Sequence, residues 1–350
     1  MAKGAVIGLD IGTTCVRAAE VELAGGGRPA TLVRYGEIPL PPGAVRDGEV
    51  TEPTAVVDAL KRLWSTAKFS RREVNIGVGN QRVVVRELTV PRMPMDQVRA
   101  SLPFQVQELL PMPVEEALLD FYPTAEREGP SGPALHGMLV AATRDTVNAN
   151  VMAVESAGLR PQMVDLSSFA LVRALIRGEL AGRTVAIVEI GARVTHVVVT
   201  ANGVPRLVRI LATGGENVTA AVASAMGVAS MEAEEIKRQV GFGFAVAPAM
   251  TPASEAVKAV IGPLVEAVRN TFVYYSSNNP GAGIEALCLT GGGSQLPGLG
   301  QALSSASRLP AAYGDALVGM RLGKALPGDQ VRAASALMAL PIGLAMGVAA

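Results

Sequence analysis

The sequence predicts a two-lobed α/β protein in which one half repeats the other and a small α+β subdomain is inserted in the first half. Two glycine turns of similar sequence, each between two apolar strands, indicate the repeat. A third turn, with three consecutive glycines, follows another apolar strand. With 350 residues, 49% of them hydrophobic, the chain is long enough to fill the cores of two lobes.

The first turn lies in GLDIGTT, Gly8 to Thr14. It lacks the third glycine of a dinucleotide-binding turn and the Gly-Lys-Ser/Thr of a P-loop, and by itself it is more typical of a plain hairpin. As a phosphate-binding turn, Gly12 lets the backbone approach closely, while Thr13 and Thr14 offer donors. Asp10 then directs its carboxylate at the accompanying metal ion.

The second turn lies in VAIVEIGARVTHVVV, Val185 to Val199, and repeats the pattern of the first. Asp10 aligns with Glu189, an offset of 189 minus 10, or 179 residues, and Gly12 aligns with Gly191. The repeat predicts two hairpins that face each other across a cleft and present backbone amides to phosphates. Both acids are expected near a magnesium ion that keeps most of its waters.

The third turn lies in ALCLTGGGSQLPGL, Ala286 to Leu299. The pattern indicates a strand, a triple-glycine turn and the start of a helix. The turn, Gly291 to Gly293 followed by Ser294, has no bulky side chain, so a planar base can lie close to it. Three glycine turns in this order favour a nucleotide site much more strongly than one.

Two further segments are candidates for the same site, each with a simpler alternative. Gly214 and Gly215 precede a helix whose N-terminus carries partial positive charge, which suits either phosphate oxygens or a plain helix cap. Lys237 lies one turn beyond Glu234 on a predicted helix. It either reaches the nucleoside or forms a solvated ion pair with that glutamate.

The segments between the turns carry helix and strand patterns. We expect a helix from about Pro53 to Ala67, with its apolar residues, Trp64 among them, on one face. The inserted segment predicts strand VVVREL, a helix over Asp96 to Leu110 and strand HGMLVAAT. A helix over Arg144 to Ala157 is followed by Gly158, strand PQMVDL and helix SSFALVRAL. A mainly helical stretch from 231 to 279 is expected to form a mobile lid.

Composition excludes several classes of protein. Lys and Arg total 31, as do Asp and Glu, and there is one Trp, so nucleic acid is not expected as the principal ligand. Cys15 and Cys288 are far apart, which argues against a disulfide framework or a zinc site and favours a reducing compartment. The two histidines, His136 and His196, are expected to be packed or exposed imidazoles rather than a catalytic pair.

Neither end of the sequence predicts a membrane segment. MAKGAVIGLDIG lacks the features of a secretory signal, so a cytoplasmic location is expected. The apolar stretch Ala333 to Ala350 is rich in alanine and contains Pro341, Gly343 and Gly347. It is interpreted as a buried helix rather than a membrane span.

GLDIGTTCVR, VEIGARVT and LTGGGSQLPGL together make the chain resemble the actin, sugar-kinase and heat-shock-chaperone ATPase superfamily. The resemblance implies an actin-like two-lobed ATPase fold of duplicated ribonuclease-H-like domains that binds ATP and Mg²⁺, with Arg17 where the superfamily often has a phosphate-facing lysine. It assigns the following residues to the cofactor site, with Asp10 and Glu189 at the metal: Asp10, Gly12, Thr13, Thr14, Arg17, Glu189, Gly191, Ala192, Gly214, Gly215, Glu234, Lys237, Gly291, Gly292, Gly293 and Ser294.

Within that superfamily, NIGVGNQRVVVRELTVPRMP and QVRASLPFQVQELLPMPVEEALLDFYP resemble the inserted subdomain of the PilM family of type IV pilus assembly proteins, related to FtsA. The resemblance extends over essentially the whole chain. It implies a cytoplasmic protein that docks the N-terminal cytoplasmic peptide of PilN and works with other proteins of the pilus inner-membrane platform. Such a protein binds no nucleic acid and is peripheral to the inner face of the membrane only through its partners.

The resemblance also implies four structural units. The first lobe comprises residues 1–74 with 160–182 and a C-terminal helix at 333–350. The inserted subdomain comprises 75–159, the core of the second lobe 183–230 with 284–332, and the helical lid 231–283.

Two departures from the superfamily pattern suggest slow or absent ATP hydrolysis. Glu189 stands where aspartate is usual, and its extra methylene shifts the metal position. Ser167 and Ser168 stand where related sequences often have a glutamate that orients the attacking water. Arg193, just beyond the second turn, either contacts a phosphate or faces solvent. Catalytic residues are therefore not assigned.

Two other functions are compatible with the same fold. A small-molecule kinase needs an acid to deprotonate the acceptor, and no unassigned acid lies in the expected interlobe segment. An FtsA-like filament-forming membrane adaptor typically ends in an amphipathic helix, whereas this chain ends in uniformly apolar GLAMGVAA. Both remain alternatives to pilus assembly at this point.

Overall fold

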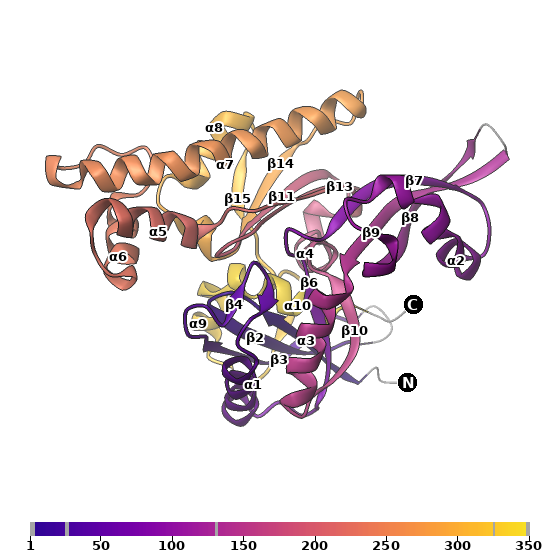
Figure 1. The fold of residues 1–350 in the computed structure, drawn as a ribbon, viewed down its shortest axis with the longest axis horizontal. Coiled ribbons are helices and arrows are strands. Elements are labelled where there is room, and N and C mark those ends of the chain that lie inside the picture. Colours follow the sequence, from indigo (N-terminus) through magenta and orange to yellow (C-terminus); the bar gives the residue numbers. More distant parts are fainter. Residues whose placement is uncertain (1–3, 25–27, 130–131, 325, 348–350) are drawn as a thin grey trace.

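The fold is known from a computed structural model that describes residues 4–24, 28–129, 132–324 and 326–347. Two large sheets form the two lobes, and a third sheet forms the inserted subdomain beside them (Figure 1). In chain order the strands are β1 (Ala5–Ile11), β2 (Cys15–Glu22), β3 (Thr31–Pro39), β4 (Val45–Arg46), β5 (Glu49–Val50), β6 (Glu73–Val78), β7 (Val84–Pro91), β8 (Ala117–Gly129), β9 (Gly132–Thr143), β10 (Arg160–Leu166), β11 (Thr184–Ile190), β12 (Thr195–Ala201), β13 (Val204–Leu211), β14 (Ala286–Thr290), β15 (Ala311–Tyr313) and β16 (Arg321–Leu322).

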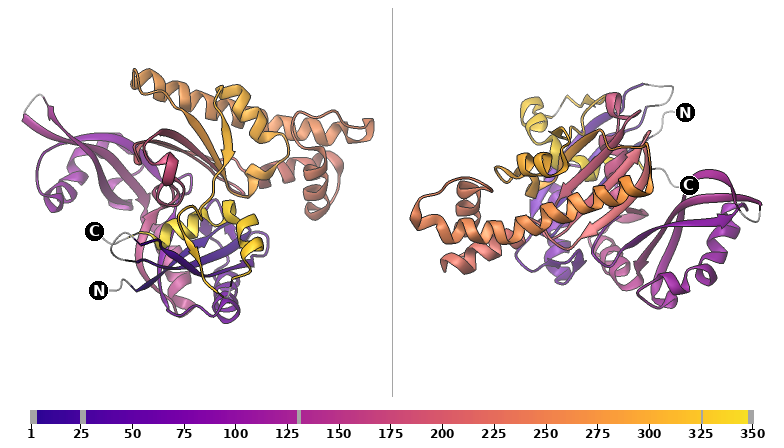
Figure 2. Two further views of the ribbon diagram at one scale, coloured as in Figure 1. Left: turned by 180° about the vertical axis from the view of Figure 1, so that it is seen from behind. Right: turned by 90° about the horizontal axis from the view of Figure 1, so that it is seen from above.

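The helices cover the sheets and join the lobes. Seen from above, α7 lies across the five-stranded sheet, and seen from behind, the inserted subdomain projects to one side (Figure 2). The α-helices are α1 (Pro53–Ala67), α2 (Met95–Gln105), α3 (Arg144–Ser156), α4 (Ser167–Leu175), α5 (Gly215–Met226), α6 (Ser230–Val240), α7 (Thr251–Asn278), α8 (Leu299–Ser307), α9 (Gly328–Ala333) and α10 (Ala339–Ala345). The helices expected at Pro53–Ala67 and over SSFALVRAL are confirmed as α1 and α4.

The two large sheets share one topology. The first runs β10-β6-β1-β2-β3-β16, and the second, followed from its β15 edge, runs β15-β14-β11-β12-β13. In each, three consecutive strands pair antiparallel, and the first of the three also pairs in parallel with a later strand. The two glycine turns join the first and second strands of each sheet. This common order confirms the duplicated, two-lobed α/β fold that the repeat predicts.

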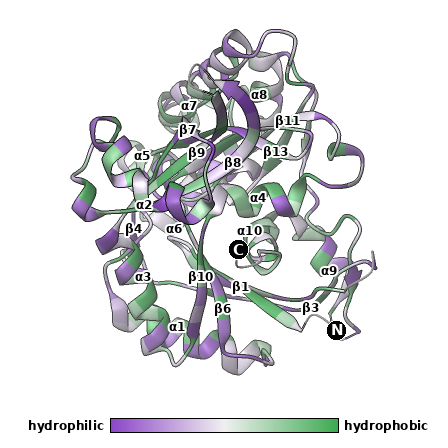
Figure 3. Cartoon of the chain, turned by 90° about the vertical axis from the view of Figure 1, so that its right-hand side faces the viewer, coloured by the Kyte–Doolittle hydropathy of each residue, from purple (hydrophilic) through white to green (hydrophobic). Residues whose placement is uncertain are grey.

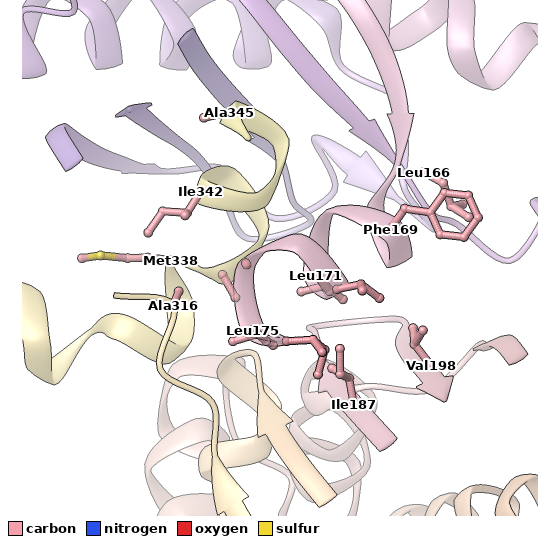
Figure 4. Packing of buried hydrophobic residues seen from close by; sticks show 14 of the residues in the cluster. Leu166, Phe169, Leu171, Leu175, Ile187, Val198, Ala316, Met338, Ile342 and Ala345 are labelled. Atoms are coloured by element: carbon pink, nitrogen blue, oxygen red, sulfur yellow. The ribbon is translucent and has the colours of Figure 1, made fainter. Parts of the chain in front are cut away.

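One hydrophobic core extends across both lobes. Side chains of α4, such as Leu171 and Leu175, lie between residues of the second sheet, such as Ile187, and residues of the C-terminal helix, such as Ile342 (Figure 4). Leu171 and Ile342 are both completely buried. Helices α4 and α10 therefore pack against each other between the sheets and connect the two lobes through shared apolar contacts.

Helix α10 packs so closely that glycine is required both in β1, which it covers, and within α10 itself, where it meets α4. A Cβ added to Gly8 of β1 would lie 2.0 Å from the carbonyl oxygen of Pro341, and one added to Gly343 would lie 1.9 Å from that of Ala170 in α4. The buried Asn75 side chain donates to the Leu344 carbonyl at 3.0 Å. The backbone of α10 thus contacts the backbones of β1 and α4 directly, where side chains would normally separate them.

The C-terminal segment is not the single helix expected over 333–350. A 3₁₀ turn at Ser335–Leu337 precedes α10, which spans only Ala339–Ala345, and residues 348–350 lie outside the described part of the chain. The proline and glycines of the segment fit only a short helix. Within the described residues, no helix combines the length and apolar character that a membrane span needs.

The inserted subdomain contains one strand more than the sequence pattern indicates. Its sheet has the order β7-β9-β8, and β8 was not among the expected elements. The ladder between β8 and β9 shifts register just after Pro123, which cannot donate a backbone hydrogen bond. The helix expected to reach Leu110 ends at Gln105, and a 3₁₀ turn continues it over Gln107–Leu109.

Replacing Gly343 by valine should separate α10 from α4 and lower the free energy of unfolding by about 2–4 kcal/mol, because the added atoms meet the Ala170 backbone. Urea denaturation measures this difference. Gly262→Ala in α7 is the matched control, since no atom lies within 4 Å of its added Cβ and alanine favours the helix. Equal stability of Gly343→Val and the wild type would contradict the packing described above.

Candidate functional site

The two glycine turns have the same hydrogen-bonded geometry. The Gly12 amide donates to the Cys15 carbonyl at 3.0 Å, and the Gly191 amide donates to the Val194 carbonyl at 2.9 Å. Within the residues that the structure describes, the amides of Thr13, Thr14 and Ala192 donate to no protein acceptor. These amides are therefore available to anionic oxygens, as expected for phosphate-binding turns.

Asp10 lies at the end of β1 in a largely buried position. Burial raises the pKa of its carboxyl group to about 6, which the positive charge of Arg17 opposes and the negative charge of Glu189 reinforces. The nearest Arg17 nitrogen is 3.8 Å from the carboxylate. Arg17, on β2, also binds Glu37 of β3 at 2.6 Å, so its guanidinium lies between the Asp10 and Glu37 carboxylates.

His196 connects the second turn to the first lobe. Its Nδ1 lies 2.7 Å from Glu189 Oε2, and its Nε2 lies 2.7 Å from the carbonyl oxygen of Gly79, directly after β6. A carbonyl oxygen only accepts, so Nε2 carries a proton. Burial acts to lower the pKa of His196, but hydrogen bonding to Glu189 and its charge outweigh burial and raise that pKa.

His196 is a site residue that was not predicted, although the repeat contains a signal for it. Glu189 pairs with His196 across its hairpin as Asp10 pairs with Arg17, and 196 minus 17 gives the same offset of 179 residues. His136 lies elsewhere, on β9, with its Nδ1 3.0 Å from the Thr89 hydroxyl. The two histidines therefore lie in different sheets and have different hydrogen-bond partners.

Asp10 and Glu189 fit a magnesium ion that is bound mainly through phosphate and water. The charge of Glu189 contributes to the raised pKa of Asp10, so the two carboxylates are close enough to repel each other, and a cation between them would relieve that repulsion. In the described part of the chain no three potential metal-binding side chains cluster together. Mg²⁺ commonly takes only one or two carboxylates beside substrate phosphates.

A cavity of about 240 Å³ brings three of the sequence motifs together. Gly215 comes from α5, Glu234 and Lys237 from α6, and Gly292 and Gly293 from the third glycine turn. A Cβ added to Gly292 would meet only a Leu337 methyl group, at 4.0 Å, so this glycine borders open space. The remaining lining residues are Ile190, Val218, Arg238, Ile261, Gln295, Leu296 and Pro297.

Lys237 is buried rather than solvated. Its Nζ donates to the Gly215 carbonyl at 3.2 Å, to the Thr219 hydroxyl at 3.0 Å and to Glu234 at 2.5 Å. Burial acts to raise the pKa of Glu234, but its hydrogen bonds to Lys237 and Thr219 outweigh burial and lower that pKa. The pair therefore joins α5 to α6 at the wall of the cavity, and the solvated-pair interpretation is wrong.

Gly214 and Gly215 shape the site rather than donate to it. The Gly215 amide donates to the Gly191 carbonyl at 2.9 Å, and the Gly214 amide donates to the Asn217 side chain at 3.0 Å. A Cβ added to Gly214 would lie 2.6 Å from the backbone of Ala192. These glycines let α5 pack on the second glycine turn, which favours the cap interpretation over direct phosphate binding.

The third glycine turn is packed against the strand that carries Glu189. Gly291 has a φ of 84°, and a Cβ there would lie 2.5 Å from the Ile190 carbonyl oxygen. A Cβ added to Gly293 would lie 2.6 Å from the Ile190 side chain, whereas the Ser294 hydroxyl is buried and donates to the Gly291 carbonyl at 2.7 Å. Gly291, Gly293 and Ser294 thus form the turn and leave Gly292 at the cavity.

Arg193 and the two serines at the start of α4 lie in defined surroundings. Arg193 lies between carboxylates of the two lobes, 4.0 Å from Asp47 and 3.9 Å from Glu216. Ser167 and Ser168 begin α4 and are both buried. The Ser168 hydroxyl has no hydrogen-bond partner among the described residues.

The chain is similar to known proteins over nearly its whole length. A model of the family described as "Type IV pilus assembly protein PilM" matches residues 8–348. Among solved structures, the "PilM-PilN type IV pilus biogenesis complex" matches with a TM-score of 0.85 and 27% identity, covering 97% of this chain and 97% of that chain.

More distant relatives share the fold. MreB5 of Spiroplasma citri bound to ADP matches with a TM-score of 0.56 and 12% identity, over 98% of this chain and 96% of that one. The cell division protein FtsA of Bacillus subtilis (strain 168) is 20% identical over 262 residues, which are 68% of this chain but only 58% of FtsA. The actin-like architecture expected from the three glycine turns is therefore confirmed.

Replacing Asp10 by asparagine should stabilise the protein near pH 7. The raised pKa means that the folded state binds a proton more tightly than the unfolded state, so stability falls as the pH rises from about 4 to 6. The free energy of unfolding of the variant should exceed that of the wild type by on the order of 2 kcal/mol near pH 7, and the two should differ little near pH 4. Urea denaturation at both pH values tests this, with exposed Asp58→Asn as the control. A variant less stable than the wild type near pH 7 would contradict it.

Proposed function

This chain belongs to the type IV pilus assembly protein PilM family, and we propose that it binds ATP with magnesium between its lobes while docking the N-terminal cytoplasmic peptide of PilN. The main support for nucleotide binding is the cavity that Lys237, Gly215 and Gly292 line together. The solved PilM–PilN complex, which the chain resembles over 97% of its length, supports the partner half.

Different residues of the chain would bind different parts of the nucleotide. The amides of Thr13, Thr14 and Ala192 would donate to phosphate oxygens, and Asp10 and Glu189 would hold a hydrated magnesium ion, which would neutralise phosphate charge. Glu234 and Lys237 keep the wall of the cavity rigid, and Gly292 lets the base lie flat against the turn. The site thus orders the nucleotide from base to terminal phosphate across both lobes.

We infer that nucleotide binding, rather than rapid hydrolysis, is the function of this site. Glu189 is already bound to His196, which restricts how it can move toward a metal ion. Ser167 and Ser168 are buried hydroxyl groups that cannot take a proton from water at neutral pH. Nucleotide occupancy would instead change how tightly the lobes close.

For the PilN peptide, the best-supported place is a groove of about 610 Å³ between β7 of the inserted subdomain and β13 of the second lobe. Both are edge strands of their sheets. Edge strands offer unpaired backbone groups to an extended peptide, and pockets for its alternate side chains supply specificity. The groove is lined by Val83, Val84, Val85, Arg86, Glu87, Leu109, Met138, Arg206, Leu207, Val208, Arg209, Ile210 and Tyr274.

The groove combines apolar and aromatic surface with positive charge. Tyr274 is 51% exposed, and the Arg209 guanidinium lies 5.5 Å from the centre of its ring. Such an aromatic and arginine pair is the kind of contact that dominates binding at protein interfaces. We place the protein in the cytoplasm, held at the inner face of the membrane through PilN and other proteins of the pilus platform.

Calorimetric titration with MgATP should show one nucleotide bound per chain. Asp10→Ala removes a metal ligand and Gly292→Trp fills the cavity, so each should weaken binding by at least about tenfold. Gly283→Trp is the control, because it adds the same bulk where no atom lies within 4 Å of an added Cβ. Phosphate release should stay below about one turnover per second. Absence of MgATP binding to the wild type would refute the nucleotide half.

A synthetic peptide with the sequence of the PilN tail should bind the full chain, as measured by fluorescence anisotropy. Tyr274→Ala should weaken that binding by about tenfold or more, since it removes the exposed ring from the groove. Val273→Ala, its exposed neighbour outside the groove, should bind like the wild type. Equal affinities of the wild type and both variants would mean that the peptide binds outside this groove. No binding to any of the three would refute the proposal that this chain docks PilN.

A further inference from the structure

A dense group of cations lies at the end of the first lobe opposite α7. The chain as a whole carries equal numbers of Lys plus Arg and Asp plus Glu, 31 of each, so this concentration is local. Three segments contribute: the C-terminal half of α1, the loop between α1 and β6, and the first residue of β10. We call the following residues the basic face: Lys61, Arg62, Lys68, Arg71, Arg72 and Arg160.

The cations of the basic face are exposed and mostly unneutralised. Arg160 pairs with Glu73 at 3.4 Å. The other five have no carboxylate oxygen within 4.0 Å in the described part of the chain. Asp58 on α1 and Glu155 on α3 are exposed nearby but form no ion pair there. The basic face therefore presents net positive charge to solvent.

The loop that carries three of these cations is held in one conformation. The Ser70 amide donates to Glu20 Oε2 at 3.1 Å, and the Ser70 hydroxyl donates to Glu20 Oε1. Glu20 is 1% exposed and also binds Arg34 at 2.9 Å, so the anchor lies inside the lobe. The Trp64 indole nitrogen donates to the Arg71 carbonyl at 2.8 Å. The charged side chains thus project from a fixed backbone.

The basic face surrounds a hollow of about 740 Å³. Its lining includes Trp64 and Phe69, whose ring centres are 4.9 Å apart, as well as all the cations except Arg62. Hydrophilic and hydrophobic colouring are mixed along α1 in Figure 3, and Figure 1 places this end of the first lobe far from α7. Glu73, paired with Arg160, also lines the hollow, but four cations without a carboxylate partner among the described residues remain around the half-buried aromatic pair. This arrangement suits a phosphate group carried on an apolar anchor.

We propose that the basic face docks directly on an anionic lipid surface, with lipid phosphate groups entering the hollow. Clusters of four to eight Lys or Arg residues attract the negative surface of a bilayer. An extended surface suits the cations better than a single acidic peptide, because they come from three segments around the hollow. This contact is separate from the nucleotide cavity and the β7–β13 groove, and it would add to attachment through a protein partner.

Co-sedimentation of the full chain with vesicles tests this proposal. The wild type should pellet with vesicles of phosphatidylglycerol and phosphatidylcholine, but not with phosphatidylcholine alone. Raising the salt to about 1 M, where the Debye length is about 3 Å, should release it. Lys61→Glu combined with Arg71→Glu should lose most of the bound fraction, because it reverses two exposed charges of the basic face.

Lys258→Glu combined with Arg269→Glu is the matched control, since it reverses two exposed charges on α7 and should pellet like the wild type. Unchanged melting temperatures of both variants would show that the fold is intact. Equal pelleting of the wild type and the Lys61/Arg71 variant would overturn the proposal. Failure of the wild type to bind anionic vesicles would overturn it too. If the wild type failed to bind vesicles but was captured on immobilised polyglutamate, the basic face would be assigned to an acidic protein partner. Neither result depends on ATP or PilN binding.

Discussion

The backbone contacts of α10 are the constraint on which the rest of the structure depends. Gly8 and Gly343 let this helix lie against β1 and α4 without intervening side chains. Because α4 also packs on the second sheet, the two sheets share one core and the two glycine turns are held opposite each other. The position of every cleft residue, from Asp10 to Gly292, follows from that arrangement.

Contact between the lobes at the cleft is polar and specific. His196 uses both ring nitrogens, one toward Glu189 of its own hairpin and one toward the Gly79 carbonyl of the other lobe. Any group that binds Glu189 therefore acts on an interlobe hydrogen bond as well. This geometry links occupancy of the cleft to lobe position through a single imidazole, without requiring hydrolysis.

Much of the fold and of the site was predictable from local pattern and from the repeat. The bounds of α1 follow from periodicity, and the proximity of Asp10 to Glu189 follows from the 179-residue offset. The burial of Lys237 was not predictable, because its partner Thr219 lies on another helix. Strand β8 was missed because Pro123 interrupts its pattern, and His196 because its Gly79 partner is distant in sequence. Such features depend on tertiary contacts rather than on neighbouring residues.

The position of α10 also bears on how the chain is made. β1 spans residues 5–11, whereas α10, which covers its Gly8, spans residues 339–345. During synthesis from the N-terminus, the first sheet must therefore keep this apolar face uncovered until the chain has been made and released from the ribosome as far as residue 345. Chains with such late closure expose apolar surface for longer and rely more on chaperones. The close interlobe packing of the finished protein thus implies a long-lived nascent state.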